Sequence, residues 1–315
     1  MRIVVKFACG LGNQLFQYAF LQSLKAYYPS AEVLGDISSY KNSKEHFGFD
    51  MPVFFDVDLN IISYDEARKY ASSYLLPANT PVSIINRLHK LQFTPIGTLI
   101  NLFAKKRAEK NAVCLGSEEP NIVYDYVYQL NTKSEKPFYL SGYWQNNYYL
   151  ERCANLHSYI RFKEEILSDV EIKQLEYIRS TKCVSVHVRR GDYLTYPEYN
   201  ICSLDYYYRA LEIIDEKMGD IPIIYFSDDP QFVKDNFKLK DVDRIIANGS
   251  SRGGCDMFLM SNCAAHIVAN SSFSFWGAYL DSNQDSIVIA PKIFKRTNQF
   301  SYSFKVPEHW ITLDL

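Results

Sequence analysis

Long apolar stretches are missing from this sequence. No run of about 18 apolar residues, the length that a membrane-spanning helix needs, occurs in it. The chain opens with MRIVV and leads straight into a strand pattern, without the basic and then apolar leader of a secreted protein. We therefore expect a soluble protein of the cytoplasm, with at most a peripheral contact to the inner membrane.

The cysteine patterns of metal sites and disulfide frameworks are also missing. The seven cysteines are an odd number, and no two of them form a C-x-x-C pair. Several lie within apolar strand or helix patterns, where a thiol acts as a small hydrophobic group. This usage favours a reducing compartment and gives no support to a zinc site.

A strong excess of charge is absent as well, since the formal net charge is −2 over 315 residues. Nothing therefore favours a general nucleic-acid binder. The Walker A sequence of P-loop enzymes is likewise missing. Tyrosine, in contrast, is abundant, with 25 residues against 3 tryptophans, and its flat ring and hydroxyl suit a sugar or nucleotide surface.

The hydrophobic pattern predicts an α/β protein. In the second half, short apolar runs alternate with segments of helix length, which indicates right-handed βαβ units and a parallel sheet. The length of the chain fits two domains. A helix pattern over 162–179 precedes the repeating part, and we place the boundary there, with an N-terminal α/β domain over 1–170 and a C-terminal Rossmann-like domain over 171–315.

The stretch CVSVHVRRGDY at 183–193 carries the clearest functional signal. Its apolar first part is typical of a strand that is buried on both faces. His187, Arg189, Arg190 and Asp192 follow at the carboxyl end, where open α/β sheets bind ligands. Two arginines at the tip of a buried strand are costly unless they meet an anion. A structural ion pair between Asp192 and one arginine is the alternative.

Two further predicted strands end in polar residues. Because the carboxyl ends of parallel strands meet at one edge of the sheet, we expect these residues to lie near the two arginines. A helix that opens at a serine offers free N–H groups to phosphate, and arginines bind a diphosphate in bidentate fashion. The pattern therefore predicts a nucleoside-diphosphate site. The residues are Ser227, Asp228 and Asp229 after one strand, and Asn270, Ser271 and Ser272 after the other.

The adjacent acids Asp228 and Asp229 also bear on metal binding. They only superficially resemble a D-x-D magnesium site, and the following Pro230 makes helix capping a sufficient explanation. Two arginines can neutralise a leaving diphosphate, so a metal ion is unnecessary. We expect neither a metal ion nor a cofactor.

Two turns of the N-terminal half are candidates for ligand contact. The first strand runs into GLGNQ and then a buried helix face, which brings Gly12 and Asn13 to a position that a ligand can approach. Leu15 stands where a dinucleotide motif has its third glycine, and a turn that needs glycine for its backbone angles alone is the alternative. A later strand pattern over 137–144 ends in aromatic and amide residues, which suit a carbohydrate and are also common in loops. These residues are Tyr143, Trp144 and Gln145.

Basic and apolar residues are interleaved over 72–110, where six cations accompany a single acid. Such a region could rest on an anionic membrane surface or form a solvated face over core helices. Pro95 and Gly97 interrupt the pattern, which favours the solvated face.

Four segments together resemble bacterial GDP-fucose-dependent α-1,2-fucosyltransferases of glycosyltransferase family 11. They occur in the expected order over almost the whole chain, and the second and fourth are highly specific. Phe275 stands where a second tryptophan is frequent, which is a conservative difference. The segments are GLGNQLFQYA at 10–19, HVRRGDY at 187–193, FSDD at 226–229 and NSSFSFWGAYL at 270–280.

The resemblance implies a GT-B fold, in which two Rossmann-like domains face each other across a cleft. It implies an acceptor mainly on the N-terminal half and GDP-fucose on the C-terminal half. It also implies metal-independent transfer, with inversion, from GDP-β-L-fucose to the 2-hydroxyl of a sugar, usually galactose in an oligosaccharide or glycolipid. Arg190 and Asn13 would act at the reacting centre. Asp192, Glu198 and Asp36 are candidates for the general base, and we assign the role to none of them.

The candidate site residues from the sequence pattern and from this resemblance fall into three groups. The catalytic candidates are Arg190, Asp192 and Asn13. The donor contacts are Gly12, Asn13, His187, Arg189, Arg190, Ser227, Asp228, Asp229, Asn270, Ser271, Ser272 and Phe273. The acceptor contacts are Asp36, Tyr143, Trp144 and Gln145.

Three other functions compete with this one. Fucose could go to another sugar or linkage in surface polysaccharide synthesis. A metal-dependent phosphohydrolase could use Asp192, Asp228, Asp229 and His187. A nucleotide- or glycan-binding module would use the arginines for docking alone.

Overall fold

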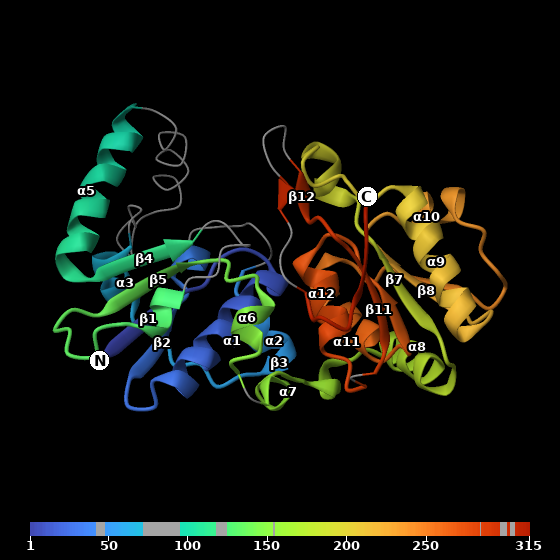
Figure 1. Cartoon of the computed structure of the whole chain (residues 1–315), viewed down its shortest axis with the longest axis horizontal. Coiled ribbons are helices and arrows are strands. Elements are labelled where there is room, and N and C mark those ends of the chain that lie inside the picture. Colours follow the sequence, from blue (N-terminus) through green and yellow to red (C-terminus); the bar gives the residue numbers. More distant parts are fainter. Residues whose placement is uncertain are drawn as a thin grey trace. The chain divides into compact units, whose positions relative to one another are not determined.

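The computed structural model describes residues 1–41, 48–71, 95–117, 125–153, 155–283, 285–296, 301–302 and 306–315. The chain divides into two compact units (Figure 1). The first unit comprises 1–49, 58–144 and 148–156, and the second comprises 50–57, 145–147 and 157–315. The sequence pattern gives a single boundary at residue 170, whereas the second unit begins earlier and also takes in two short preceding segments.

The first unit contains a four-stranded parallel sheet in the order β2-β1-β5-β4. Strand β1 (Arg2–Lys6), helix α1 (Leu11–Tyr27) and strand β2 (Glu32–Asp36) form a βαβ unit. Strands β5 (Phe138–Gly142) and β4 (Val113–Ser117) complete the sheet. Helix α1 is buried over most of its length, as its apolar spacing predicts.

The second unit contains a six-stranded parallel sheet in the order β14-β11-β10-β7-β8-β9. In this Rossmann order the first three strands run to one side and the next three to the other, so that the topological switch point lies between β7 and β10. The strands are β7 (Val184–Val188), β8 (Ile223–Ser227), β9 (Arg244–Ile246), β10 (Ala265–Ile267), β11 (Ile287–Pro291) and β14 (Ile311–Leu313).

Helices cover both faces of this sheet. Residues of α9 and α10 share a core with β7, β8 and β10, and α11 packs against α8 and α12. Figure 1 shows α11 and α12 on the opposite side of the sheet from α9 and α10. All five residues of β7 are consequently buried, as the apolar run predicts. The helices are α8 (Asp169–Ser180), α9 (Leu204–Met218), α10 (Pro230–Asn236), α11 (Gly253–Ser261) and α12 (Ser272–Tyr279).

Helix α5 and several short elements make up most of the remaining described chain. Strands β3 and β6 pair in antiparallel fashion, as do β12 and β13. The α-helices are α2 (Met51–Phe54), α3 (Tyr64–Tyr70), α5 (Pro95–Asn111), α6 (Asn147–Leu150) and α7 (Leu156–Tyr159). The 3₁₀ turns are η1 (Ser38–Lys41), η3 (Asp125–Tyr128), η4 (Glu164–Ile166), η5 (Gly191–Thr195) and η6 (Ser250–Arg252). The short strands are β3 (Phe55–Asp56), β6 (Arg161–Phe162), β12 (Lys295–Arg296) and β13 (Ser301–Tyr302).

Two helix boundaries differ from the sequence pattern. The helix predicted over 162–179 begins only at Asp169, because Ser168 and Glu171 form a capping box at that point. In the basic region, 72–94 lies outside the described residues. Helix α5 begins at Pro95, where the sequence pattern predicts an interruption, and it continues through Gly97 without a break. Within the part of the chain that the structure describes, no helix is both long and apolar enough to cross a membrane.

Candidate functional site

His187 lies at the carboxyl end of β7 and is almost completely buried, with 5% of its surface exposed. Burial, with a further contribution from the Arg189 charge, lowers the pKa of His187 to about 3, so the ring is neutral at physiological pH. Its Nδ1 atom has no hydrogen-bond partner among the described residues. The ring centroid lies 5.4 Å from that of Phe273, the second residue of α12. A buried, unsatisfied ring nitrogen beside an aromatic ring suits a planar polar ligand such as a nucleobase.

Arg189 is held between two carboxylates. Its Nη2 atom lies 2.6 Å from Oδ1 of Asp192, and its Nη1 atom lies 2.7 Å from Oδ2 of Asp228. The predicted pairing of Asp192 with an arginine is therefore present, and the partner is Arg189. Two acids at this distance fix the guanidinium and neutralise its charge.

Arg190 is farther from protein carboxylates than Arg189 is. Its guanidinium carbon lies 3.9 Å from the centre of the Phe232 ring. The Nε atom is 4.0 Å from Oδ2 of Asp229 and has no hydrogen-bond partner among the described residues. Of the two arginines, Arg190 is thus the one whose donors are better available to an anion.

Asp228 links both arginines to the end of β8. Besides its ion pair with Arg189, it accepts a hydrogen bond of 2.8 Å from the backbone N–H of Arg190. A Cβ atom added at Gly191 would lie only 2.5 Å from Oδ2 of Asp228. The glycine of the RRGD segment is therefore required for close approach of this carboxylate.

The other acid of this pair, Asp229, caps a helix. Its Oδ1 atom accepts a hydrogen bond of 3.0 Å from the N–H of Phe232, and Pro230 is the first residue of α10. This confirms the capping that the Asp-Pro sequence predicts. Ser227 is buried, donates a hydrogen bond of 2.8 Å to the carbonyl of Val188, and thereby ties β8 to β7.

The three polar residues after β10 have two roles, since one of them anchors loops and the other two begin a helix. Asn270 is buried and donates to the carbonyls of Tyr199 and Phe294 at 2.8 and 3.0 Å, which anchors two loops. Ser271 caps α12 and accepts a hydrogen bond of 3.3 Å from the N–H of Phe273. Ser272, the first residue of α12, is half-buried at the same edge. The helix start, not the asparagine side chain, is the part that can face an anion.

Parallel pairing brings these strand ends to one edge. Val188 lies opposite Ser227 on β8, and Val186 lies opposite Ile267 on β10. Tyr193, which follows the arginines, donates a hydrogen bond of 3.2 Å to the carbonyl of Asn270. The arginines and the start of α12 therefore flank the switch point between β7 and β10, where doubly wound sheets bind their ligands.

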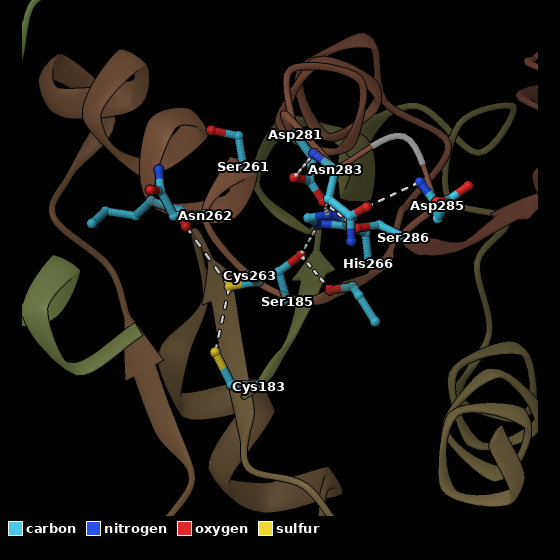
Figure 2. A network of polar contacts seen from close by, with 12 residues as sticks. Cys183, Ser185, Ser261, Asn262, Cys263, His266, Asp281, Asn283, Asp285 and Ser286 are labelled. Atoms are coloured by element: carbon cyan, nitrogen blue, oxygen red, sulfur yellow. Dashed lines mark hydrogen bonds and ion pairs between the residues drawn. The ribbon is translucent and has the colours of Figure 1, made fainter. Parts of the chain in front are cut away.

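A buried polar network ties the same two strands together below this edge (Figure 2). Ser185 on β7 lies 2.8 Å from Nδ1 of His266 on β10, and Nε2 of His266 lies 3.0 Å from Oδ2 of Asp281. Asp281 also accepts hydrogen bonds from Ser286 and from the N–H of Asn283. Burial raises the pKa of Asp281, but the hydrogen bonds from His266 and Ser286 outweigh it and lower the pKa overall.

This serine, histidine and aspartate are not arranged for attack on a substrate. Ser185, His266 and Asp281 are 3%, 1% and 7% exposed, so a ligand cannot reach the hydroxyl. A proton on Nε2 of His266 satisfies the carboxylate and lets Nδ1 accept from the serine. We interpret the network as a structural connection between β7, β10 and the segment after α12.

The predicted residues of the first unit are either half-buried or buried. Gly12 is buried within α1, and Asn13, in its first turn, is half-buried. Asp36 is 1% exposed and accepts hydrogen bonds of 2.7 Å from the Tyr139 hydroxyl and 2.8 Å from the N–H of Ser38. Its carboxylate is therefore occupied by buried hydrogen bonds within the unit.

The aromatic cluster after β5 is similarly divided. Trp144 is 2% exposed and stacks on Phe20 of α1, with ring centroids 4.0 Å apart. Tyr143 and Gln145 are half-buried and therefore partly reachable from solvent. Of this group, they are the residues whose side chains a ligand could contact.

Sequence reasoning missed two supports of the arginines. Phe232 lies under Arg190, and Tyr193 lies 5.4 Å from the guanidinium of Arg189, measured to the centre of its ring. Tyr193 stands within the RRGDY segment and could have been suspected from its position. Phe232 comes from α10, and only the packing of that helix beside β7 and β8 reveals its contact.

The chain matches a family model over almost its whole length and is similar to several known proteins. The family model "Glycosyl transferase family 11" matches residues 2–313. An alpha-1,2-colitosyltransferase of Escherichia coli is 29% identical, over 99% of this chain and 99% of its own length. A galactoside alpha-(1,2)-fucosyltransferase 1 of Rattus norvegicus is 27% identical, over 54% of this chain and 48% of its own. A crystal structure of NodZ alpha-1,6-fucosyltransferase soaked with GDP-fucose aligns with a TM-score of 0.49 and 17% identity, over 89% of this chain and 92% of that chain.

The match to the family model spans both units and includes every residue of the switch-point site. The resemblance that the four sequence segments indicate is therefore confirmed. This chain belongs to glycosyl transferase family 11 and is a glycosyltransferase.

Proposed function

We propose that this protein transfers L-fucose from GDP-β-L-fucose to the 2-hydroxyl of a terminal galactose in an acceptor glycan, with inversion and without a metal ion. The observation that carries the proposal is the pair of neighbouring guanidinium groups at the switch point. Arg189 is fixed by two carboxylates, and Arg190 rests on Phe232 with donors available. The names of the two curated relatives support an α-1,2 linkage and a deoxy-sugar donor.

The donor nucleotide would lie along the edge formed by β7 and β10. The diphosphate would bind the Arg190 guanidinium and the free N–H groups at the start of α12. Neutral His187, with its unsatisfied Nδ1 atom, would hydrogen-bond to the guanosine beside Phe273. One of the carboxylates of Asp228 and Asp229 could accept from the guanosine only by giving up part of its present contacts.

The chemistry requires stabilisation of separated charge. Breaking the bond between fucose and phosphate places positive charge on the sugar and negative charge on the departing GDP. A guanidinium that is already oriented stabilises this negative charge without reorganising in the transition state. Arg190 has this role in the proposal, and Phe232 and Asp229 hold it in position.

The proposal gives Asp192 the task of orienting Arg189. Its carboxylate lies 2.6 Å from the guanidinium, and this ion pair holds one of its oxygens against Arg189. The acceptor hydroxyl must still lose a proton when it attacks the donor, and the group that takes this proton is unassigned.

Residues of the first unit, together with Gln145 of the second, are the proposed acceptor contacts. Tyr143 and Gln145 combine an aromatic face with an amide, which together suit sugar rings and hydroxyls. Asn13, in the first turn of α1, would approach the reacting centre. Asp36 and Trp144 would act through the packing of the unit, because both are almost completely buried.

A second donor is favoured by one observation. A relative that matches over 99% of this chain is named an alpha-1,2-colitosyltransferase. Colitose is the 3-deoxy counterpart of fucose, so both sugars could use the same diphosphate site. Discrimination between them would depend on contacts to a single hydroxyl.

The test is a transfer assay with GDP-fucose and GDP-colitose as donors, and with GDP-mannose and UDP-galactose as controls. Galactose, lactose, lacto-N-biose and N-acetyllactosamine are the acceptors, each assayed with and without excess EDTA. We expect EDTA-resistant release of GDP, dependent on acceptor, and a product with an α-1,2 linkage by NMR. Hydrolysis of GDP-fucose that needs a divalent metal would refute the proposal, and so would GDP binding without transfer to any acceptor.

A further inference from the structure

Helix α5 packs on its own unit through a narrow strip of small residues. Ala104 and Ala108 are 2% and 1% exposed, and Ala112, one turn further, is 3% exposed. These residues are four apart and therefore lie on one side of the helix. Most of the remaining circumference of α5 faces outward.

The outward side carries large apolar residues at its N-terminal end. Leu99, Leu102 and Phe103 are 54%, 51% and 66% exposed, and Phe103 is the most exposed large hydrophobic residue in the described chain. They fall within little more than one helical turn. A concentration of this kind is unusual on the surface of a globular protein, where exposed apolar residues are normally scattered.

Cations continue this side toward the C-terminal end of α5. Leu99, Phe103, Lys106 and Lys110 follow one another at spacings of four, three and four, so they form one stripe along the helix. Both lysines are exposed, as is the neighbouring Lys105. The stripe thus begins apolar and ends basic.

We propose that this stripe of α5 docks the protein on a bilayer that contains anionic lipid. The apolar half would enter the boundary between headgroups and acyl chains, and the lysines would meet lipid phosphates. Charge distribution favours this occupant over a second copy of the chain. A parallel copy would place lysines against lysines, and an antiparallel copy would place lysines against the apolar half.

The inference concerns a face distinct from the arginine site and does not depend on the identity of the donor. It departs from the interpretation that the sequence favoured, a solvated face over core helices, because the exposed side of α5 combines large apolar residues with lysines. A soluble acceptor should therefore be used equally well by a protein whose stripe is altered.

The experiment is flotation of the full-length protein with vesicles of phosphatidylcholine alone or with about one-third phosphatidylglycerol. We expect binding to the anionic vesicles only, and its loss at high salt. Each lysine near an anionic surface strengthens binding roughly fivefold, so the double variant Lys106→Glu/Lys110→Glu should bind at least about twentyfold more weakly. The double variant Leu99→Ser/Phe103→Ser should also lose binding at low salt.

Matched controls change equivalent residues elsewhere. Lys217→Glu/Lys234→Glu reverses two exposed lysines, and Val170→Ser/Ile172→Ser replaces two exposed apolar residues of α8. Both should float like the wild type. Equal binding to neutral vesicles, undiminished binding by the stripe variants, or no binding to anionic vesicles would overturn the proposal. So would concentration-dependent self-association, measured by analytical ultracentrifugation, that the stripe variants abolish.

Discussion

Replacement of Arg190 by alanine tests the site most directly. The side chain is 26% exposed, stacks on Phe232, and lies 4.0 Å from Asp229. Its loss removes no tightly bonded structural contact, because Asp228 is held by Arg189 and by the Arg190 backbone N–H, which alanine retains. The variant should fold as the wild type does.

The expected effect is on the rate. Removal of one preorganised donor to a developing negative charge costs about 3 kcal/mol, which is on the order of a hundredfold in kcat. Arg190→Lys keeps a charge but loses the planar fork, so we expect an intermediate loss of roughly tenfold. Phe232→Leu removes the aromatic face under the guanidinium and should cost about 1 kcal/mol, or roughly fivefold.

Steady-state release of GDP from GDP-fucose, in the presence of a good acceptor, measures these rates, and circular dichroism checks the fold. Arg209→Ala, which removes an exposed arginine paired with Asp205 on α9, is the matched control and should leave kcat unchanged. A folded Arg190→Ala protein with a kcat within about threefold of wild type would refute the assignment, because no donor worth ~3 kcal/mol would then be missing.

Three further predictions concern the surroundings of the arginines and the base of the second unit. Gly191→Ala should displace the Asp228 carboxylate, since its Cβ would lie 2.5 Å from Oδ2, and weaken GDP binding by calorimetry roughly tenfold, the equivalent of one charge-assisted hydrogen bond. His187 stays neutral to about pH 3 in the folded protein, whereas the unfolded residue protonates near pH 6.5. Protonation of the unfolded state should therefore lower the free energy of unfolding by about 1.4 kcal/mol per pH unit as the pH falls below 6.5. The variant His187→Phe should remove this slope, as measured by urea titrations at several pH values. Glu171→Gln should lower that free energy by about 3 kcal/mol at neutral pH, because it breaks the pair of a buried carboxylate with Arg252.

A specific result would contradict the first two of these predictions, and a control variant accompanies the third. Unchanged GDP affinity in Gly191→Ala would mean that the carboxylate can move without consequence. Identical pH slopes in wild type and His187→Phe would mean that His187 is hydrated in the folded protein. For the buried pair, Glu164→Gln is the control: its ion pair with Arg179 is about half exposed on both sides and should contribute less than about 1 kcal/mol.

Local sequence rules predicted the elements that carry the candidate site. The apolar run before His187 predicts a buried strand, and all five residues of β7 are buried. The Asp-Pro pair predicts the cap of α10, because an acceptor oxygen followed by a fixed backbone angle suits a helix start regardless of the surroundings. These inferences hold since the interactions concerned lie within a few residues of one another.

Contacts between residues that lie far apart in the chain could not be predicted from the sequence. Asp36 and Trp144 stand at strand ends like ligand contacts, but Tyr139 and Phe20 cover them, and which side chain covers another depends on the whole unit. The pairing of Asp192 with Arg189 could likewise not be chosen from spacing, because the turn at Gly191 determines which arginine the carboxylate reaches. The strand order that creates the switch point follows only from the folded sheet.

The hydrogen-bonded chain from Ser185 through His266 to Asp281 has a consequence for how the enzyme can adapt to its donor. It crosses between the two strands that carry the arginines and the start of α12, so the separation of these two halves is fixed from inside the sheet. Any spreading of β7 from β10 would leave a buried hydroxyl or imidazole unsatisfied. If the proposed diphosphate site lies at this edge, variants that accept donors of different size should arise in the loops above the sheet, while Ser185, His266 and Asp281 keep the distance between β7 and β10 constant.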